Sequence, residues 1–357
     1  MSAATLSPTE TTSASQGKTP RAVIFGCAGL RLEEAEREFF RDADPLGFIL
    51  FARNCELPEQ LTELVADLRD AVGRPDAPVL IDQEGGRVVR MSPPHWRKPP
   101  AAEVIGALAE RDLATGRGAA WLNARLIAAE LEQVGIDVCC LPVLDLRYSG
   151  ASSVVGDRAF SADGEIVAEL GRAACQGLLA GGVLPAIKHM PGHGRAMSDS
   201  HHEMPRVEAS FEELNESDFR PFRALNDMPL GLSAHVCFSA LDADAPATLS
   251  SNVIENAIRG AIGFDGLLLT DDLSMEALSG SQGERAAAAL AAGCDIALHC
   301  NGSLEEMADV AASVAEMSAE AARRWAGAKI KLKRDKLSEF NALSDEFNKL
   351  IEAFSRS

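Results

Sequence analysis

Residues 184–205 read LPAIKHMPGHGRAMSDSHHEMP, a short apolar run that leads into a long polar loop. The loop holds Lys188, Asp199 and four of the chain's seven histidines, namely His189, His193, His201 and His202. Histidine is the side chain whose ordinary pKa lies nearest neutrality, so such a cluster indicates proton transfer or metal binding. Catalytic groups also concentrate on loops that a rigid scaffold holds in place. We therefore interpret the run as a strand and the loop as part of a functional site, in preference to a polar loop whose histidines only hydrogen-bond one another.

The apolar run at Leu184 is one of eight that alternate with longer amphipathic stretches from Arg21 onward. Such alternation is typical of a parallel α/β sheet. The eight runs are Ala22–Cys27, Gly47–Phe51, Pro78–Ile81, Asp137–Leu144, Leu184–Ile187, Leu230–Val236, Gly266–Thr270 and Cys294–Leu298.

Five of the intervening stretches have apolar residues at the three- and four-residue spacing that predicts a helix. They are Leu57–Val72, Ala119–Val134, Ile166–Leu179, Val253–Ile262 and Arg285–Ala292. Eight strand-and-helix pairs in roughly 300 residues predict an α/β fold with a single (β/α)₈ barrel of the TIM type. A doubly wound open sheet is the alternative, but no Gly-x-Gly-x-x-Gly turn or Walker loop follows any of the runs.

The chain divides into three parts. Residues 1–19 are rich in Ser, Thr and Ala without a basic start and an apolar run, so we expect a flexible tail and no secretory signal. Residues 20–320 are expected to form the catalytic barrel. Residues 321–357 begin with basic residues and continue with an amphipathic run. This pattern predicts a helical extension that packs either on the barrel or on a partner subunit, and the oligomeric state stays open, with a monomer favoured.

The composition limits the ligands that the protein can bind. The chain has 357 residues, of which 46% are hydrophobic, and a formal charge of −19. This charge argues against nucleic acid or an anionic membrane as a partner and favours a small ligand. Eight cysteines without a Cys-x-x-Cys spacing are typical of reduced core residues in a cytoplasmic protein. The adjacent Cys139 and Cys140 could be redox-active, but neighbouring strand residues point to opposite faces. No apolar segment approaches the length of a membrane span.

Polar side chains follow five of the predicted strands at the end where barrels of this class place their chemistry. The segments are Asp82–Arg90, Lys188–His189, Ala234–His235, Asp271–Met275 and His299–Gly302. Asp271 directly follows an apolar run, and a partly desolvated carboxylate there could be a nucleophile, a general base or a metal ligand. It could also cap the next helix, so that one of Asp271 and Asp272 caps while the other reacts. Asp82 and Glu84 present the same choice, and for Asp82 we favour ligand binding.

A metal site is the less favoured interpretation of the histidines. His189 and His193 are four residues apart, as on a zinc-binding helix, but Pro191, Gly192 and Gly194 argue against a helix there. A site assembled from several strands is the alternative that stays open. We predict no metal and no other cofactor.

Four motifs in the same order along the chain closely resemble a known family. They are Ile81–Arg90 (IDQEGGRVVR), Lys188–Pro205 (KHMPGHGRAMSDSHHEMP), Ser233–Val236 (SAHV) and Thr270–Met275 (TDDLSM). The chain resembles, over roughly residues 20–315, the glycoside hydrolase family 3 β-N-acetylglucosaminidases of the bacterial peptidoglycan-recycling type. Each motif alone is weak evidence, whereas the ordered set is specific.

The resemblance implies a role for each matching residue. Asp271 matches the family's nucleophile, and His201 matches an unusual general acid/base that Asp199 orients. The residues implied in holding the terminal sugar are Asp82, Arg90, Arg158, Lys188 and His189. One departure is Arg195-Ala196, where relatives commonly have Asp-Thr after His-Gly.

The activity implied is the retaining removal of terminal non-reducing N-acetylglucosamine from peptidoglycan fragments by a cytoplasmic β-N-acetylhexosaminidase. Retaining hydrolysis needs a carboxylate that attacks the anomeric carbon and a second group that first donates and then removes a proton. A histidine near neutrality can do the second task, with a carboxylate to orient it. Three alternatives stay open: transfer of the sugar to phosphate at the same site, a metal-dependent barrel hydrolase, and a sugar-binding module without catalysis.

Overall fold

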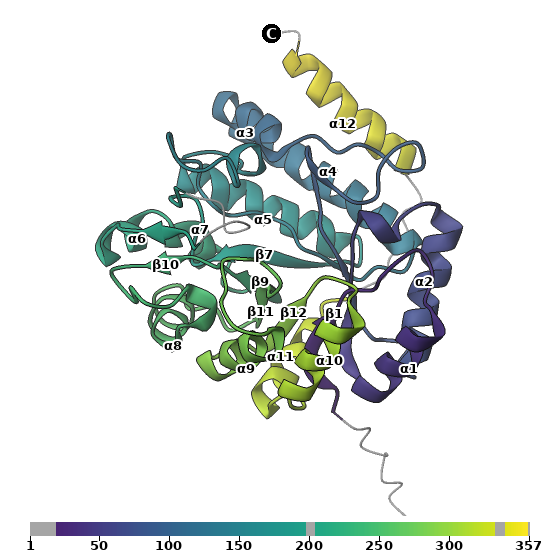
Figure 1. The fold of residues 1–357 in the computed structure, drawn as a ribbon. Helices are drawn as coiled ribbons and strands as arrows, with labels where there is room; N and C mark the ends of the chain where they lie inside the picture. Colours follow the sequence, from purple (N-terminus) through teal and green to yellow (C-terminus); the bar gives the residue numbers. More distant parts are fainter. Residues whose placement is uncertain (1–18, 198–203, 333–339, 356–357) are drawn as a thin grey trace, which may run out of the picture.

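Eight parallel strands close into a barrel in the computed structural model, which describes residues 19–197, 204–332 and 340–355 (Figure 1). β1 pairs with β2 on one side and with β12 on the other, so the sheet has no open edge. The (β/α)₈ prediction is confirmed, and the doubly wound open sheet is excluded. In order around the barrel, the strands are β1 (Arg21–Phe25), β2 (Pro45–Leu50), β3 (Val79–Ile81), β6 (Val138–Cys139), β7 (Leu184–Met190), β9 (Leu230–Ser233), β11 (Leu267–Asp272) and β12 (Ile296–His299).

All eight strands lie where the apolar runs predicted them, for a simple physical reason. One face of each strand lines the barrel interior and the other is covered by helices, so the strands have no solvent face. Phe25, Phe48, Leu80 and Leu269 are completely buried. The sequence of such strands is therefore a continuous apolar run instead of an alternating one.

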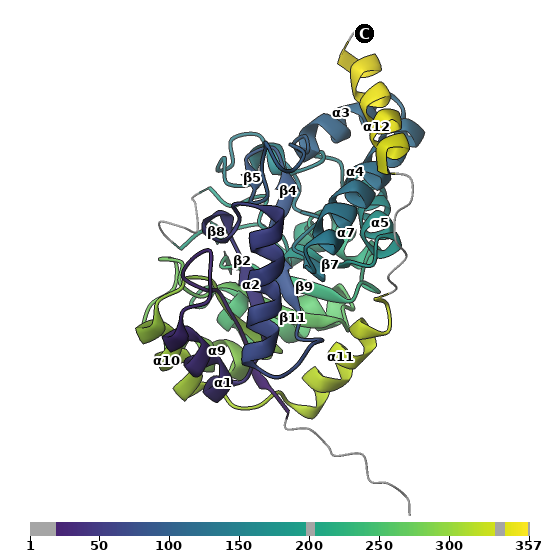
Figure 2. The ribbon, with the colours of Figure 1, turned by 90° about the vertical axis from the view of Figure 1, so that its right-hand side faces the viewer.

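The helices surround the barrel, and α1 packs against α2 on one side of it (Figure 2). No helix in the described parts of the chain has both the length and the apolar character that a bilayer span requires. The α-helices before the C-terminal extension are α1 (Glu34–Ala43), α2 (Pro58–Ala71), α3 (Ala102–Arg111), α4 (Leu113–Gln133), α5 (Gly164–Ala180), α6 (Phe211–Glu216), α7 (Phe219–Ala224), α8 (Ser251–Val253), α9 (Gln282–Ala292) and α10 (Leu304–Ser313).

Two of the predicted helices differ from the observed ones. α4 begins at Leu113, six residues before the predicted start at Ala119, because the Asp112 carboxylate accepts hydrogen bonds from two amides of its first turn. The predicted helix at Val253–Ile262 is mostly a π-helix, η4 (Ile254–Ala261). Apolar spacing over so few turns does not distinguish an α-helix from the wider π form.

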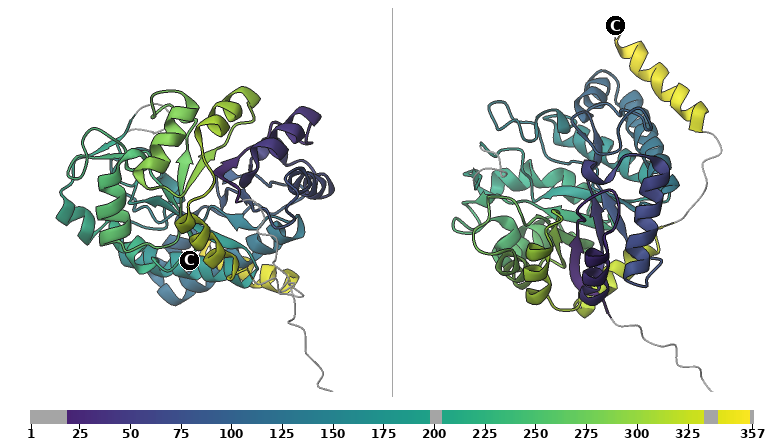
Figure 3. Two further views of the ribbon diagram at one scale, coloured as in Figure 1. Left: turned by 90° about the horizontal axis from the view of Figure 1, so that it is seen from below. Right: turned by 45° about the vertical axis from the view of Figure 1, so that its right-hand side comes forward.

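Both helices of the C-terminal extension contact the barrel. α11 (Ala319–Lys329) lies beside β11, where the guanidinium of Arg324 binds the buried Asp295 carboxylate at 2.8 Å. α12 (Phe340–Ser355) packs along α4 through residues such as Phe347, which is 3% exposed (Figure 3). The chain therefore provides a packing partner of its own for each helix.

Candidate active site

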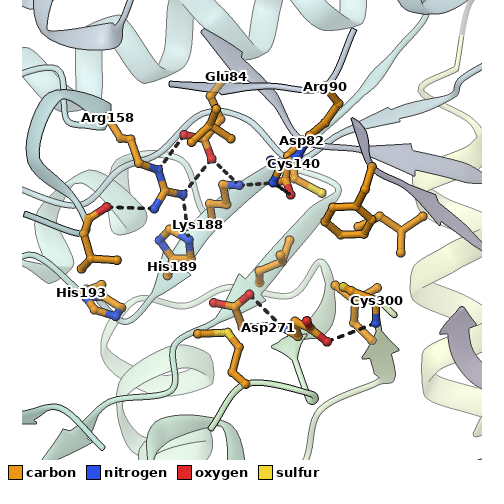
Figure 4. Close-up of a pocket in the computed structure, with 18 of the residues that line it drawn as sticks. Asp82, Glu84, Arg90, Cys140, Arg158, Lys188, His189, His193, Asp271 and Cys300 are labelled. Carbon is orange, nitrogen blue, oxygen red and sulfur yellow. Dashed lines mark hydrogen bonds and ion pairs between the residues drawn. The ribbon is translucent and has the colours of Figure 1, made fainter. Parts of the chain in front are cut away.

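The carboxyl ends of the barrel strands enclose a cavity of about 300 Å³ (Figure 4). Six of the predicted site residues line it together: Asp82, Arg90, Arg158, Lys188, His189 and Asp271. The other two, Asp199 and His201, lie outside the described residues. The remaining residues of the lining are Ile49, Phe51, Glu84, Arg87, Val88, Cys140, Val154, Val155, His193, Leu232, Asp272, Met275, Leu298 and Cys300.

Lys188 lies at the centre of an ion network on one wall. β7 carries its side chain into the barrel mouth, where it is 3% exposed. The Nζ atom lies 2.6 Å from an oxygen of Asp82 and 2.6 Å from an oxygen of Glu84. Burial disfavours the ammonium form, but the two carboxylates outweigh it and raise the pKa of Lys188 above its ordinary value. The lysine is therefore a fixed cation that can donate hydrogen bonds to a ligand.

Two arginines extend this network around the wall. Arg158 binds the Glu84 carboxylate in a bidentate manner, at 2.8 and 2.7 Å, and Arg90 binds Asp82 at 3.2 Å. Burial would raise the pKa values of both carboxyl groups, but the neighbouring cations lower them below their ordinary values. All of these groups are charged at neutral pH, which suits the recognition of hydroxyl and amide groups.

A small antiparallel hairpin of β4 (Gln83–Gly85) and β5 (Val88–Val89) presents Glu84 and Arg90. Gly85 and Gly86 turn the hairpin with positive φ angles of 111° and 57°, which favour glycine. The side chain of Gln83 accepts a hydrogen bond from the Arg90 amide at 2.9 Å and so holds the hairpin closed. The Gly-Gly pair in IDQEGG is therefore needed for the turn that brings both charges into the cavity.

Asp145 is a site residue that the sequence analysis missed. It is completely buried behind His189, whose Nδ1 lies 2.6 Å from one carboxylate oxygen, while the other accepts the His193 amide at 2.6 Å. Because Nδ1 makes this contact, Nε2 of His189 points toward the cavity, where it lies 3.4 Å from the Arg158 guanidinium. Asp145 directly follows the apolar run Asp137–Leu144, so the strand-end criterion could have found it.

Asp271 lies at the end of β11, at the base of the cavity and across from the ion network (Figure 4). Burial alone would raise the pKa of this carboxyl group. The neighbouring His189 and His235 act in the opposite direction and help to lower the pKa to about 2. The Asp272 amide donates to one of its oxygens at 2.9 Å. The side chain is therefore an ionised carboxylate that is partly desolvated, as a nucleophile requires.

Asp272 has a structural task. Its carboxylate accepts hydrogen bonds from the amide and the hydroxyl of Ser274 at 3.0 and 2.6 Å, and from the Cys300 amide at 3.1 Å. It therefore closes the turn after β11 and joins it to β12. Neither aspartate caps the next helix, because the side chain of Ser281 caps α9. Both aspartates line the cavity, and Asp272 is the one whose carboxylate holds the turn.

The remaining described histidines of the barrel mouth differ in position. His193 lines the cavity, and burial is the main cause that lowers its pKa to about 4. His235 is buried beneath the site, with its ring nitrogens 2.8 Å from the Thr248 hydroxyl and 2.9 Å from the Asp272 carbonyl oxygen. His299 lies 3.1 Å from Asn301. Neither His235 nor His299 is part of the cavity lining.

The described residues do not favour a metal site. Among residues 19–197, 204–332 and 340–355, no group of three or more His, Cys, Asp or Glu side chains is placed to hold a metal ion. Asp82 and Glu84 instead pair with the cations Lys188, Arg90 and Arg158. The arrangement suits a small polar ligand held by hydrogen bonds over a reactive carboxylate.

Known proteins with similar sequences agree with this chemistry. The family model "Glycosyl hydrolase family 3 N terminal domain" matches residues 16–326. A Beta-hexosaminidase of Bordetella avium is 40% identical over 286 residues, which covers 79% of this chain and 81% of that protein. A Beta-hexosaminidase of Tolumonas auensis is 42% identical over 287 residues, with 78% of this chain and 82% of that protein covered.

Solved structures give the same result. NagZ from Neisseria gonorrhoeae in complex with N-trifluoroacetyl-D-glucosamine superposes with a TM-score of 0.85 at 32% identity, covering 93% of this chain and 98% of that one. A glycoside hydrolase family 3 β-N-acetylglucosaminidase from Paenibacillus superposes with a TM-score of 0.80 at 31% identity, covering 94% of this chain and 66% of that one. The chain therefore belongs to glycosyl hydrolase family 3 and, within it, to the β-hexosaminidases.

Proposed function

We propose that the protein is a retaining exo-β-N-acetylglucosaminidase that removes terminal non-reducing N-acetylglucosamine from peptidoglycan fragments. Asp271 forms a covalent glycosyl intermediate, and His201, oriented by Asp199, is the general acid/base. The observation that carries the proposal is the ionised Asp271 carboxylate at the base of a cavity whose opposite wall is a network of hydrogen-bond donors.

The first step follows from the state of Asp271. Its low pKa, about 2, keeps the carboxylate ionised at neutral pH. One carboxylate oxygen attacks the anomeric carbon while the bond to the leaving oxygen breaks, and the acid supplies the proton to that oxygen. Water then attacks the same carbon, the base removes its proton, and the Asp271 carboxylate is released.

The opposite wall supports the exo mode of action. Lys188, Arg158 and Arg90 present donors in fixed positions, and Asp82 and Glu84 present acceptors between them. The hydroxyl groups of a terminal sugar ring need donors and acceptors in such alternation. The cavity volume, about 300 Å³, lies at the low end of the usual range of ligand sites, about 300–1,000 Å³. A single sugar unit therefore suits this cavity.

The choice of N-acetylglucosamine rests on the relatives. The structure of the Neisseria gonorrhoeae protein contains N-trifluoroacetyl-D-glucosamine, a close analogue of that sugar. The general acid/base assignment and the peptidoglycan substrate rest on the motif resemblance, since Asp199 and His201 lie outside the described residues. On either side of that segment, His193 lines the cavity, and Arg206 begins β8 (Arg206–Val207), which pairs with β10 (Cys237–Phe238).

Incubation with an activated 2-deoxy-2-fluoro glycoside followed by peptide mass spectrometry tests the proposal. We expect the label on Asp271, and we expect Asp271→Ala to lose at least about 1,000-fold in kcat on an aryl N-acetyl-β-glucosaminide. Asp227→Ala is the control, since this aspartate precedes β9 at the other end of the barrel and does not line the cavity. A label on another residue, or full turnover by Asp271→Ala, would refute the nucleophile. Sugar phosphate as the product in phosphate buffer would show transfer to phosphate instead of hydrolysis.

A further inference from the structure

Four polar side chains outside the cavity meet where the loop after β7 crosses the loop after β6. They are Tyr148, Arg195, Ser217 and Asp218, and none of them is part of the cavity lining. Arg195 belongs to the Arg195-Ala196 pair that distinguishes this chain from the usual family motif. Tyr148 is the only tyrosine of the chain. The chemistry described above gives these residues no task.

The Asp218 carboxylate is the centre of the group and is 2% exposed. One of its oxygens accepts a hydrogen bond from Nε of Arg195 at 2.7 Å and another from the Tyr148 hydroxyl at 3.0 Å. The guanidinium also lies over the Tyr148 ring, 4.4 Å from its centroid, and donates to the Ser217 hydroxyl at 3.1 Å. Arg195 therefore joins three segments through an ion pair, a stacked contact and a hydrogen bond.

The loop after β7 and the loop after β6 also contact each other beside this group of four side chains. The Ala196 carbonyl oxygen accepts the Ser152 amide at 2.9 Å, directly beside Arg195. Gly194 passes so close to the other loop that a Cβ atom at this position would lie 2.0 Å from the Leu146 carbonyl oxygen. The turn after β7 is thus a rigid contact surface for the loop after β6.

A continuous series of hydrogen bonds leads from this contact to the cavity wall. The Ser152 hydroxyl accepts a hydrogen bond from the Val154 amide at 3.3 Å, and the Val154 carbonyl oxygen accepts one from Nη1 of Arg158 at 3.2 Å. Val154 and Arg158 both line the cavity, and Arg158 also holds Glu84. The loop that supplies this wall is therefore fixed at its outer side by the turn that contains Arg195.

We propose that Arg195 is a positioning residue for sugar binding. It holds the turn at 191–197 against the loop at 145–158, so that Val154 and Arg158 keep the places at which they contact the terminal sugar. The inference rests on the proposed function, because it takes N-acetylglucosamine as the sugar that the cavity holds. It concerns binding of the sugar and not the covalent step.

The test compares Arg195→Ala with Arg172→Ala. The control arginine also forms an ion pair, with Asp227, and its side chain is 32% exposed against 27% for Arg195, but it lies on α5 away from the cavity. For each variant, KM and kcat on an aryl N-acetyl-β-glucosaminide are measured, together with the inhibition constant of free N-acetylglucosamine. Thermal unfolding and active-site titration with the fluorosugar give the folded fraction.

We expect Arg195→Ala to raise KM and the inhibition constant about 10-fold, with kcat per active site changed less than about 3-fold. Arg195→Lys, which keeps the charge, should recover part of the affinity, and Tyr148→Phe, which keeps the ring, should shift it less than Arg195→Ala does. Arg172→Ala should match the parent.

An unchanged inhibition constant in Arg195→Ala, or a loss confined to the fraction of folded enzyme, overturns the inference while leaving the proposed function intact. A parent enzyme that hydrolyses another hexosaminide but is not inhibited by N-acetylglucosamine overturns the sugar assignment, and the inference with it.

Discussion

Replacement of Glu84 by glutamine removes one negative charge from the ion network while keeping the shape of the side chain. The Glu84 side chain is 5% exposed and accepts three hydrogen bonds from charged donors. Two come from Arg158, at 2.8 and 2.7 Å, and one from Lys188, at 2.6 Å. In the variant both cations stay buried, and Arg158 loses the negative charge of its partner.

The expected cost follows from these contacts. Removal of one partner from a buried ion pair costs about 3–5 kcal/mol, and one hydrogen bond to a charged group contributes about 1.5–3 kcal/mol. The glutamine oxygen can still accept one of the three hydrogen bonds. We therefore expect the free energy of unfolding to fall by about 3 kcal/mol in Glu84→Gln and by about 5 kcal/mol in Glu84→Ala.

The loss of stability in Glu84→Gln should become smaller as the pH falls. Burial raises the pKa of Glu84, but Lys188 and Arg158 outweigh it, so the pKa in the folded state lies below the ordinary value. A carboxyl group of this kind stabilises the fold above its unfolded pKa, about 4.3, and loses that effect as the pH falls toward the folded pKa. The difference between the parent and Glu84→Gln should be complete at pH 7 and should narrow below about pH 4.

Urea unfolding at pH 7 and at several values below pH 5 measures this difference. Glu103→Gln is the matched control, because Glu103 pairs with Arg147 but its side chain is 51% exposed. An exposed pair contributes about 0–1 kcal/mol, so the control should change little. A loss in Glu84→Gln no larger than in the control, or a difference that does not vary with pH, would refute the role given to this charge.

Two further predictions concern the neighbouring carboxylates. The pKa of Asp271 is lowered to about 2, so the carboxylate should stay ionised from about pH 7 to 4. The rate at which a fluorosugar with a dinitrophenyl leaving group labels Asp271 should therefore stay constant over this range. A half-maximal rate near pH 5 would contradict this prediction. Asp145→Asn removes the charge that faces Nδ1 of His189, so the inhibition constant of N-acetylglucosamine should rise about 10-fold, and an unchanged constant would show that the carboxylate does not orient the ring.

The strands could be predicted from the sequence because burial on both faces gives each one an uninterrupted apolar run. The helices were harder to predict. α1 was not predicted, because it is rich in charge and buries only Glu36, Phe40 and Ala43. Its buried glutamate accepts the Ala28 amide at 2.8 Å, a tertiary contact without a trace in the local pattern. α3 was also missed, and it is separated from α4 only by Asp112.

The site could be predicted residue by residue but not as a network. Asp82, Arg90, Lys188 and Asp271, which line the cavity, were predicted because each lies at or after the end of a predicted strand, and Arg158 was predicted only through the family resemblance. The pairing of Glu84 with both Lys188 and Arg158 depends on distances between segments more than 70 positions apart in sequence, and Asp145 is hidden behind His189. Sequence spacing carries no information about such contacts, so the partners emerged only from the fold.

The division of work among the carboxylates explains why Asp271 is the one assigned to react. Asp82 and Glu84 are bound to cations, and Asp272 is bound to the backbone and hydroxyl groups of its own turn. Each of these three would have to give up strong contacts before it could attack a carbon atom. Asp271 forms no ion pair with a described residue at the base of the cavity, and its hydrogen bond to the Asp272 amide holds one oxygen in place. In the proposed mechanism the second oxygen is the attacking atom, and attack from it requires the least loss of existing contacts.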